Sequence, residues 1–454
     1  MSSARHILIA SIRLMVVVVA ARGMSACKDV VVSRSFGTST QLDAFLAAYG
    51  IMGFLGSAIS GAAQSALVPM LTGPASEAEE NSRRQLVTAT LVAAVLGPGT
   101  VAFVALLLRA PLIALTVPGF AGEQAALTRD LLVPLAFVPP LATVQAVLFG
   151  TLNARYGFRA AASTTAITPI LICAILLASS NPQGAHLAWG TAAGLALEIL
   201  TLSLLARRAG VSLARRGSLD RVRQELSRFG SQFFPLLAGT ALSSTSPIVD
   251  QAFASASGSG SLAILNYAGR ITALAIGLGI TTIGSVALPH FSALAAARAW
   301  TALSALLKRV SAATFALSLV PTLGVIIFSE SLVRLLFQRG HFVESDTIAV
   351  ARAQAFYALQ IPFHLTGILS IRALQALQRS GVIFGFVGLN VAANFVADYV
   401  CTRWFGVAGI ALSSSLMYML SCASAFTFAM LELKRRAQLQ SPEPLDSASV
   451  GLKR

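Results

Sequence analysis

The sequence predicts an all-α polytopic membrane protein, and three observations lead to that class. Of the 454 residues, 56% are apolar and only 11% are charged, whereas a soluble globular protein carries roughly 25% charged residues. The mean hydropathy is +0.76. The apolar residues form stretches of about 20 residues, which suits a membrane-crossing helix and is far longer than a barrel strand. This pattern excludes a soluble enzyme, a disordered chain and a collagen-like chain.

Twelve stretches are predicted to cross the membrane as helices. The first contains Arg13 and is the least apolar, and no A-x-A pattern closes it. We therefore interpret it as a membrane helix and not as a cleaved signal peptide. The predicted spans are residues 7–27, 43–70, 87–108, 131–152, 160–179, 186–206, 230–254, 262–288, 310–328, 348–371, 382–401 and 405–431.

The basic residues predict how these spans are oriented. If the N-terminus lies inside, most arginines and lysines fall in connections on the inner side, while the opposite connections 180–185 and 255–261 carry no charge. Cytoplasmic loops are enriched in such residues, so we expect both termini in the cytoplasm. The net charge of +15 then reflects topology, and nucleic-acid binding is disfavoured. The 207–228 connection contains Arg207, Arg208, Arg215, Arg216, Arg221, Arg223 and Arg228.

Sequence motifs give no indication of catalysis. The four cysteines form no CxxC pair, which disfavours a zinc site or a disulfide framework. No HExxH, Walker A or GxSxG motif occurs, so we expect neither ATP hydrolysis nor another enzymatic activity.

An internal repeat divides the predicted chain into two halves. Pro69 in "QSALVPML" corresponds to Pro289 in "GSVALPHF", and Leu152 corresponds to Leu374, at offsets of 220 and 222 residues. Duplicated halves around a central cavity are typical of transporters, although chance similarity among Leu/Ala-rich helices is the alternative. The predicted boundaries are an N-terminal six-helix half at 1–206, a basic cytoplasmic linker at 207–229, a C-terminal six-helix half at 230–431 and a cytoplasmic tail at 432–454.

Ionisable residues within membrane spans are costly and therefore indicate function. Cations predominate near the first helix, and a cationic cavity suits an anionic substrate such as a phosphate or carboxylate. Asp43 would be the counter-charge when the site is empty. Alternatively, Lys28, Asp29 and Arg34 are helix-end residues that reach the membrane interface, and Arg13 is structural.

A second polar cluster predicts a cation site. Asn394 and Asp398 are spaced i, i+4 and share one helix face, which Ser414 and Asp250 would approach. Hard oxygen ligands of this kind suit a small cation such as Na⁺ or H⁺. The alternative is an interhelical hydrogen-bond network that only holds the bundle together.

Five stretches resemble the MurJ/MviN family of lipid-linked precursor flippases, within the larger group of multidrug, oligosaccharidyl-lipid and polysaccharide exporters. Together they cover most of both repeats. They are "RGMSACKDVVVSRSFGTSTQLDAFLAAY" (22–49), "GTLNARYGFRAAASTTAITPIL" (150–171), "VDQAFASASGSGSLAILNYAGRITALAIGLGITTIGSVALPHFSALA" (249–295), "LVRLLFQRGHFVESDT" (332–347) and "NFVADYVCTRWFGVAGIALSSSL" (394–416).

The resemblance implies two groups of site residues. The substrate group would line a cationic cavity that holds the pyrophosphate of a polyprenol-linked sugar. The metal group would form the sodium site that some members have, with Ile410 contributing its backbone carbonyl. The substrate group is Arg22, Lys28, Asp29, Asp43 and Arg270, and the metal group is Asp250, Asn394, Asp398, Ile410 and Ser414.

The sequence departs from the family pattern in three places. Gly56 and Ser57 stand in the region where the family usually has an Arg-Arg pair, and Gly269 replaces the Asp of the "NYADR" motif. Twelve spans are predicted, whereas the family commonly has fourteen, the last two forming a groove for the lipid tail. These departures bear on which substrate is moved.

Four hypotheses for function follow. The first is an inner-membrane flippase for a lipid II-like peptidoglycan precursor, working beside the cell-wall synthesis machinery, with no cofactor other than Na⁺ or H⁺ as coupling ion. The second is a flippase for another lipid-linked oligosaccharide, such as an exopolysaccharide unit. The third is a cation-coupled exporter of small molecules, and the fourth is a membrane scaffold that transports nothing.

Overall fold

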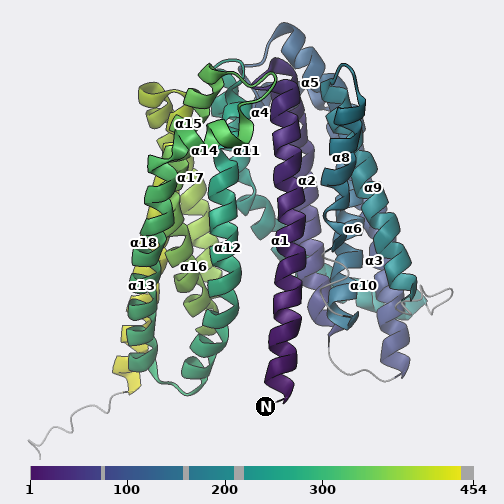
Figure 1. Cartoon of the computed structure of the whole chain (residues 1–454). Helices are drawn as coiled ribbons and strands as arrows, with labels where there is room; N and C mark the ends of the chain where they lie inside the picture. The colour runs from purple at the N-terminus through teal and green to yellow at the C-terminus, as the bar shows by residue number, and fades with distance from the viewer. Residues whose placement is uncertain (1, 73–76, 157–162, 209–218, 441–454) are drawn as a thin grey trace, which may run out of the picture. The chain divides into compact units, whose positions relative to one another are not determined.

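The computed structural model describes residues 2–72, 77–156, 163–208 and 219–440, and the regular secondary structure in these ranges is helical (Figure 1). The helices are α1 (Ser2–Phe36), α2 (Thr40–Leu71), α3 (Glu77–Leu107), α4 (Arg109–Thr116), α5 (Gly122–Leu135), α6 (Val138–Tyr156), α8 (Ile167–Ala178), α9 (Gly184–Arg208), α10 (Leu219–Ser243), α11 (Thr245–Ala256), α12 (Ser261–Ala296), α13 (Trp300–Ile327), α14 (Ser329–Phe337), α15 (Glu344–Ala358), α16 (Gln360–Ala376), α17 (Ser380–Phe405) and α18 (Val407–Gln440).

The all-α polytopic class is confirmed. Each of the twelve predicted spans is mostly helical where its residues are described, and some of them contain short non-helical breaks. Among the described residues, seven helical segments are long and apolar enough to cross a membrane, judged by length and composition. Helix α10 begins at Leu219, within the predicted linker, and α18 continues to Gln440, within the predicted tail.

Three predicted spans are each two consecutive helices. The breaks separate α5 from α6, α10 from α11 and α15 from α16. A proline stands in the first turn of each second helix, at Pro139, Pro247 and Pro362. There its missing N–H removes no intrahelical hydrogen bond. Hydropathy runs smoothly across these positions, so the sequence pattern does not reveal the breaks.

The chain divides into two compact units. Unit 1 comprises Met1–Arg270, Glu330–Ala353 and Asp398–Ile410, and unit 2 comprises Ile271–Ser329, Gln354–Ala397 and Ala411–Arg454. This division follows packing and differs from the repeat, since α12, α15, α17 and α18 each contribute to both units. The halves at 1–206 and 230–431 stay a prediction.

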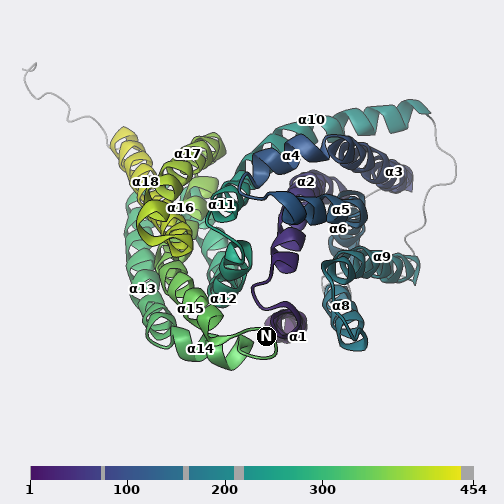
Figure 2. The ribbon, with the colours of Figure 1, turned by 90° about the horizontal axis from the view of Figure 1, so that it is seen from above.

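Unit 1 is built on packing of α2 against α3, α6 and α10. Leu67 and Leu71 of α2, Leu86 of α3 and Val147 of α6 are buried together with Phe229 of α10. Helices α8 and α9 lie side by side in both views (Figures 1 and 2). Small residues permit such close packing of membrane helices.

The α8–α9 contact shows this most clearly at Gly194. A Cβ on Gly194 of α9 would lie 2.8 Å from Cα of Thr168, which is too close for any side chain. The glycine is therefore what lets the two backbones approach.

Unit 2 has its own core. Phe291 of α12, Leu303 and Leu307 of α13, Leu369 of α16 and Leu433 of α18 are buried against one another. A polar group beside this core links α18 to the end of α16.

That polar group centres on a buried carboxylate. Glu432 Oε1 accepts hydrogen bonds from Arg379 Nε at 3.0 Å and Arg436 Nε at 2.9 Å. Arg436 Nη2 also donates to the carbonyl of Leu377, at 3.0 Å. The carboxylate is thus paired and hydrogen-bonded, as a buried charge requires.

Candidate functional site

Unit 1 brings together three of the five residues predicted to bind substrate. Asp29 of α1 lies between two cations, with its Oδ1 3.0 Å from Lys28 Nζ and its Oδ2 3.2 Å from Arg270 Nε of α12. The Asp29 side chain is 10% exposed, whereas those of Lys28 and Arg270 are 22% and 41% exposed. The cations are therefore the accessible members of this ion group.

Arg270 is also held from its own helix. Its Nη2 donates to Asn266 Oδ1 at 3.0 Å, one turn earlier on α12. Asp29 and Asn266 therefore orient the guanidinium, and its remaining N–H donors are available to a ligand. A planar fork of this kind suits phosphate or carboxylate.

The group carries excess positive charge. Two cations and one carboxylate leave a formal charge of +1. Arg22 is half-buried, seven residues before Asp29 on the same helix, and has no ion-pair or hydrogen-bond partner among the described residues. A spacing of seven places two residues on one face of a helix. We define Arg22, Lys28, Asp29 and Arg270 as the cationic group.

Asp43 does not serve as the counter-charge, and that expectation is wrong. Its Oδ2 accepts from Gly260 N at 2.6 Å and its Oδ1 from Ala263 N at 2.9 Å, and the residue is fully buried. These N–H groups belong to the start of α12, where the first donors of a helix lack intrahelical partners and a negative charge is favoured. Asp43 caps a helix from a distant part of the chain, while Asp29 supplies the counter-charge. A direct role of Asp43 in substrate binding stays a prediction.

The α1–α2 connection is held by residues that the sequence reasoning did not single out. Tyr267 donates its hydroxyl to the carbonyl of Gly37 at 3.2 Å, and Thr38 Oγ1 donates to Asp346 Oδ1 at 2.8 Å. His341 N donates to the carbonyl of Arg34 at 3.0 Å. These contacts bring three of the family-like stretches together in unit 1 and position the end of α1.

Two glycines were the sequence signal that could have indicated this connection, and both adopt positive φ in the structure. Gly37 has φ +54° and Gly340 has φ +63°, a region that other residues enter at a cost. A Cβ on Gly37 would overlap the carbonyl of His341, and one on Gly340 would overlap that of Arg34. Both glycines lie within the stretches quoted for the resemblance, in "SFGTS" and "QRGHF".

Glu198 is a second buried carboxylate at a helix start. It accepts from Thr168 N at 3.1 Å, in the first turn of α8, and from the side-chain amide of Gln145 on α6. Its exposure is 2%. Glu198 therefore ties α6, α8 and α9 together, and its position inside a span has a structural explanation.

The residues predicted to bind a cation belong to both units. Asp250, Asp398 and Ile410 are in unit 1, whereas Asn394 and Ser414 are in unit 2. Asn394 and Asp398 are buried, at 1% and 0% exposure, and share a face of α17. No cluster of three or more His, Cys, Asp or Glu side chains suited to a metal ion occurs in the described ranges. The predicted set contains only two carboxylates, and it stays a prediction.

The structure shows the surroundings of the residues at two of the three departures from the family pattern. Gly56 is buried, and a Cβ there would lie 3.4 Å from Pro139 Cα of α6. A side chain at Gly56 would therefore start in van der Waals contact with α6. Ser57 is exposed and donates to the carbonyl of Phe54. A Cβ on Gly269 would meet nothing within 4 Å, so that position has room for a larger residue.

Solved structures show which fold this chain shares. The chain is similar to a structure entitled "Lipid II flippase MurJ, inward closed conformation", with a TM-score of 0.78 at 20% identity over 93% of this chain and 91% of that one. It is also similar to an inward-facing multidrug resistance MATE family transporter of the MOP superfamily, with a TM-score of 0.73 at 13% identity over 92% and 96%. The chain shares the fold of these two structures.

The family follows from the sequence match. A family model described as "Lipid II flippase MurJ" matches residues 32–445, and the chain belongs to that family. The resemblance found in the sequence is confirmed.

Curated relatives agree with this assignment. A probable lipid II flippase MurJ of Rhizobium meliloti (strain 1021) is 27% identical over 62% of this chain and 53% of its own length, and one of Helicobacter pylori (strain J99 / ATCC 700824) is 30% identical over 44% and 43%. The chain spans about half the length of these relatives. The lipid II flippase MurJ of Burkholderia cenocepacia (strain J2315) is 26% identical over 92% and 81%.

Proposed function

We propose that the protein is a flippase that moves a polyprenyl-pyrophosphate-linked peptidoglycan precursor from the inner to the outer leaflet of the cytoplasmic membrane. The observation that carries this proposal is the cationic group, in which Arg22, Lys28 and Arg270 outnumber the single carboxylate of Asp29. Family membership supports the same substrate class.

A pyrophosphate would compete with Asp29 for its cations. The Arg270 side chain is 41% exposed, and an exposed ion pair is weak enough to exchange partners. A bound pyrophosphate would pair with Arg270 and Lys28 and give Arg22 a partner. When the headgroup leaves, Asp29 would again hold the two cations. The lipid tail would remain in the bilayer throughout, as alternating access of a headgroup site requires.

The energy source is part of the proposal. Moving one charge through the membrane potential is worth about 2.3 kcal/mol per 100 mV, and a group with excess positive charge would feel that field on its empty return. Alternatively, Na⁺ or H⁺ would couple through Asp250, Asn394, Asp398, the Ile410 carbonyl and Ser414. Transport assays with an imposed potential and no Na⁺ gradient would separate the two sources.

The proposal places the protein in the bacterial inner membrane with both termini in the cytoplasm, and it makes the cell-wall synthesis machinery its functional neighbour. The basic connections support this orientation.

The test is rescue of a bacterial strain depleted of its own peptidoglycan flippase. Wild-type protein is expected to restore growth, and Arg22→Gln is expected to fail. Loss of one charge-assisted contact costs about 1.5–3 kcal/mol, or roughly 10–100-fold in headgroup affinity. Arg34→Gln is the matched control, because Arg34 is on the same helix but exposed.

Equal amounts of each variant in the membrane must be verified by immunoblot. Rescue by Arg22→Gln at wild-type level would contradict the role of the cationic group. Failure of both variants would show a general need for positive charge on α1.

A second candidate substrate is another lipid-linked oligosaccharide, such as an exopolysaccharide unit. The sequence at Gly56 and Ser57 favours it, because the family usually has an Arg-Arg pair in that region. This candidate predicts that the wild-type protein inserts into the membrane without rescuing the depleted strain, while vesicles containing it translocate a polyprenyl-pyrophosphate glycan of a different sugar composition. A small-molecule exporter would tolerate both Arg22→Ala and Arg270→Ala.

A further inference from the structure

Unit 2 contains a groove whose lining includes none of the residues of the cationic group. Helices α13, α16 and α18 line two adjoining open cavities of about 460 Å³ each, which share Lys308 and Phe426 as lining residues. The outer cavity also contacts Trp300 and Lys434, and the inner cavity contacts Ser311 and Thr366. We call these two cavities together the α13–α18 groove.

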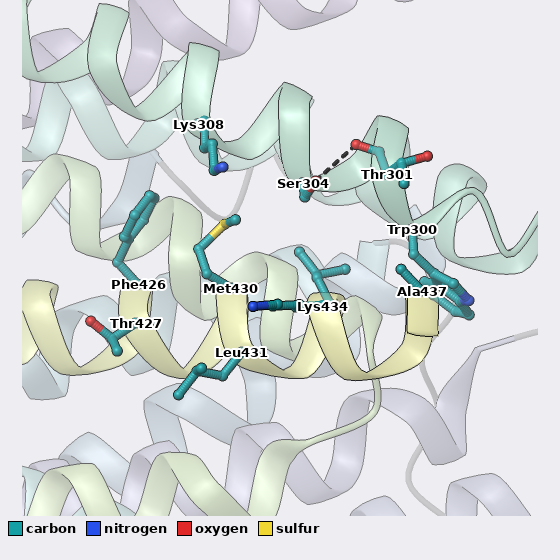
Figure 3. A pocket seen from close by; sticks show the side chains of 11 residues that line it. Trp300, Thr301, Ser304, Lys308, Phe426, Thr427, Met430, Leu431, Lys434 and Ala437 are labelled. Carbon is teal, nitrogen blue, oxygen red and sulfur yellow. Dashed lines mark hydrogen bonds between the residues drawn. The ribbon is translucent and has the colours of Figure 1, made fainter. Parts of the chain in front are cut away.

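Two lysines stand at the outer cavity. Lys308 of α13 and Lys434 of α18 both line this cavity, and Lys308 points from α13 toward α18 (Figure 3); both lysines are exposed. Within the described part of the chain, neither ammonium has an ion-pair or hydrogen-bond partner. Two unpaired cations beside an apolar wall are complementary to an anion that carries hydrocarbon.

An aromatic residue marks the level of the membrane surface. Trp300 begins α13 and lines the outer cavity, and the guanidinium of Arg436 lies 5.2 Å from its ring centroid. Tryptophan is enriched at the boundary between hydrocarbon and headgroups. By the predicted orientation, this end of α13 faces the cytoplasm.

Buried hydroxyls without partners lie one turn deeper. Ser311 and Thr366 are 5% and 6% exposed and line the inner cavity, and Ser311 Oγ and Thr366 Oγ1 have no hydrogen-bond partner in the structure as described. A buried hydroxyl without a partner is unfavourable, so a bound acceptor would stabilise both hydroxyls.

Beyond the hydroxyls the groove is apolar. Phe315 of α13 and Phe363 of α16 make an edge-to-face pair with centroids 5.5 Å apart, and Met419 lies beside them. Along α13, Ser311 is about 4.5 Å and Phe315 about 10.5 Å beyond Lys308. The order along the groove is therefore cation, hydroxyl and hydrocarbon-like wall.

We infer that the α13–α18 groove is a binding site for an anionic glycerophospholipid of the cytoplasmic leaflet. Its phosphate would lie between Lys308 and Lys434, its ester carbonyls would accept from Ser311 and Thr366, and an acyl chain would pass along Phe315. Basic pockets between transmembrane helices on the cytoplasmic side bind such headgroups. The site is separate from the proposed transport function.

The hydroxyls distinguish this occupant from a polyprenyl phosphate. Both lipids carry a phosphate that would suit the lysines. Only a glycerophospholipid places carbonyl acceptors next to the phosphate, at the depth of Ser311 and Thr366. A polyprenyl chain would leave both hydroxyls unsatisfied.

The experiment uses Trp300 as a reporter. The chain has three tryptophans, so Trp189→Phe and Trp404→Phe leave Trp300 alone in the purified full-length protein. Phosphatidylglycerol with bromine near the top of its acyl chains is titrated into neutral detergent micelles, in parallel with brominated phosphatidylcholine. Phosphatidylglycerol is expected to quench Trp300 at an apparent affinity at least about tenfold higher. Equal quenching by the two lipids would overturn the assignment.

Neighbouring residues provide a charge-matched control. The double variant Lys308→Gln/Lys434→Gln is expected to lose the preference for phosphatidylglycerol. The double variant Arg309→Gln/Arg435→Gln removes the same charge from exposed residues that do not line the groove, and it is expected to keep the preference. Equal loss in both doubles would reduce the effect to general surface charge and overturn the site.

A second measurement compares two lipids on the same Trp300 reporter protein. Ether-linked phosphatidylglycerol lacks the ester carbonyls, so it is expected to bind the Trp300 reporter protein severalfold more weakly than the ester form. Ser311→Ala/Thr366→Val should abolish that difference. Equal binding of ester and ether lipid to the reporter protein would overturn the assignment, and so would displacement of phosphatidylglycerol by an equal concentration of polyprenyl phosphate. Because these are binding measurements on purified protein, their failure is distinguishable from failure of the rescue assay.

Discussion

Asp43 and Glu198 are buried carboxylates inside predicted membrane spans, and each faces backbone N–H groups at the start of another helix. Asp43 accepts from Gly260 and Ala263 at α12, and Glu198 accepts from Thr168 at α8. A helix start presents unpaired donors and a partial positive charge, which compensate a buried carboxylate without any cation. An intramembrane acid is therefore an ambiguous sign of function until its partners are known.

Removal of the Asp43 carboxylate is expected to destabilise unit 1. Asp43→Ala leaves two buried backbone donors without acceptors, which costs about 2–4 kcal/mol. Asp43→Asn keeps one side-chain acceptor and should have an intermediate effect. Thermal unfolding of the purified variants in detergent would measure this order. An unchanged midpoint for Asp43→Ala would show that its carboxylate is not structural and would favour direct substrate binding.

The elements of unit 1 meet through connections whose backbones approach closely. The α1–α2 connection contacts both the start of α12 and the α14–α15 connection, through Tyr267, His341 and Asp346. These contacts join residues some 230 to 310 positions apart. The position of α1, and hence of the cationic group, depends on connections that hydropathy does not describe.

Two glycines with the same φ allow the cost of backbone strain to be measured separately from the cost of steric overlap. Gly37 and Gly122 both have φ +54°, but a Cβ on Gly37 would overlap His341, whereas one on Gly122 meets nothing within 4 Å. Gly122→Ala is expected to cost about 1–2 kcal/mol from the positive φ alone. Gly37→Ala is expected to cost at least about 2 kcal/mol more, because the backbone must move. Denaturant unfolding of both variants tests this, and equal losses would show that the close approach is relaxed at no cost.

At the scale of the whole molecule, charge distribution predicts the orientation in the membrane. The 180–185 connection is uncharged, while the 207–228 connection contains seven arginines. We expect the first to face the periplasm and the second the cytoplasm.

Single cysteines test this orientation. In a background with the four native cysteines replaced, Asn181→Cys in intact cells should react with a membrane-impermeant maleimide, whereas Ser218→Cys should react only after lysis. Labelling of Ser218→Cys in intact cells would contradict the predicted topology. The labelling experiment does not depend on the rescue assay with its Arg34→Gln control, so orientation and function are tested separately.

Much of the molecule was predictable from the sequence. Hydropathy and the positions of arginine and lysine are known directly from the residues of each stretch. They were therefore sufficient to predict the helical class, the twelve spans and the expected orientation. Stretches such as "NYAGR" and "QRGHF" were sufficient to recognise the family, which the match over residues 32–445 confirms. Arg22, Lys28, Asp29 and Arg270 were predicted as site residues from the resemblance to the family, together with their charge and their place in or near membrane spans.

Only the tertiary structure decided which of these residues are partners. It paired Asp29 with Lys28 and Arg270, and it turned Asp43 toward the N–H groups of α12. It also broke three spans at prolines, and it brought Lys308 and Lys434 to one groove with the buried hydroxyls of Ser311 and Thr366. The physical reason is that ion pairs, helix caps and grooves depend on distances between residues far apart in the chain. Hydropathy and charge, in contrast, are properties of individual residues and are known from the sequence.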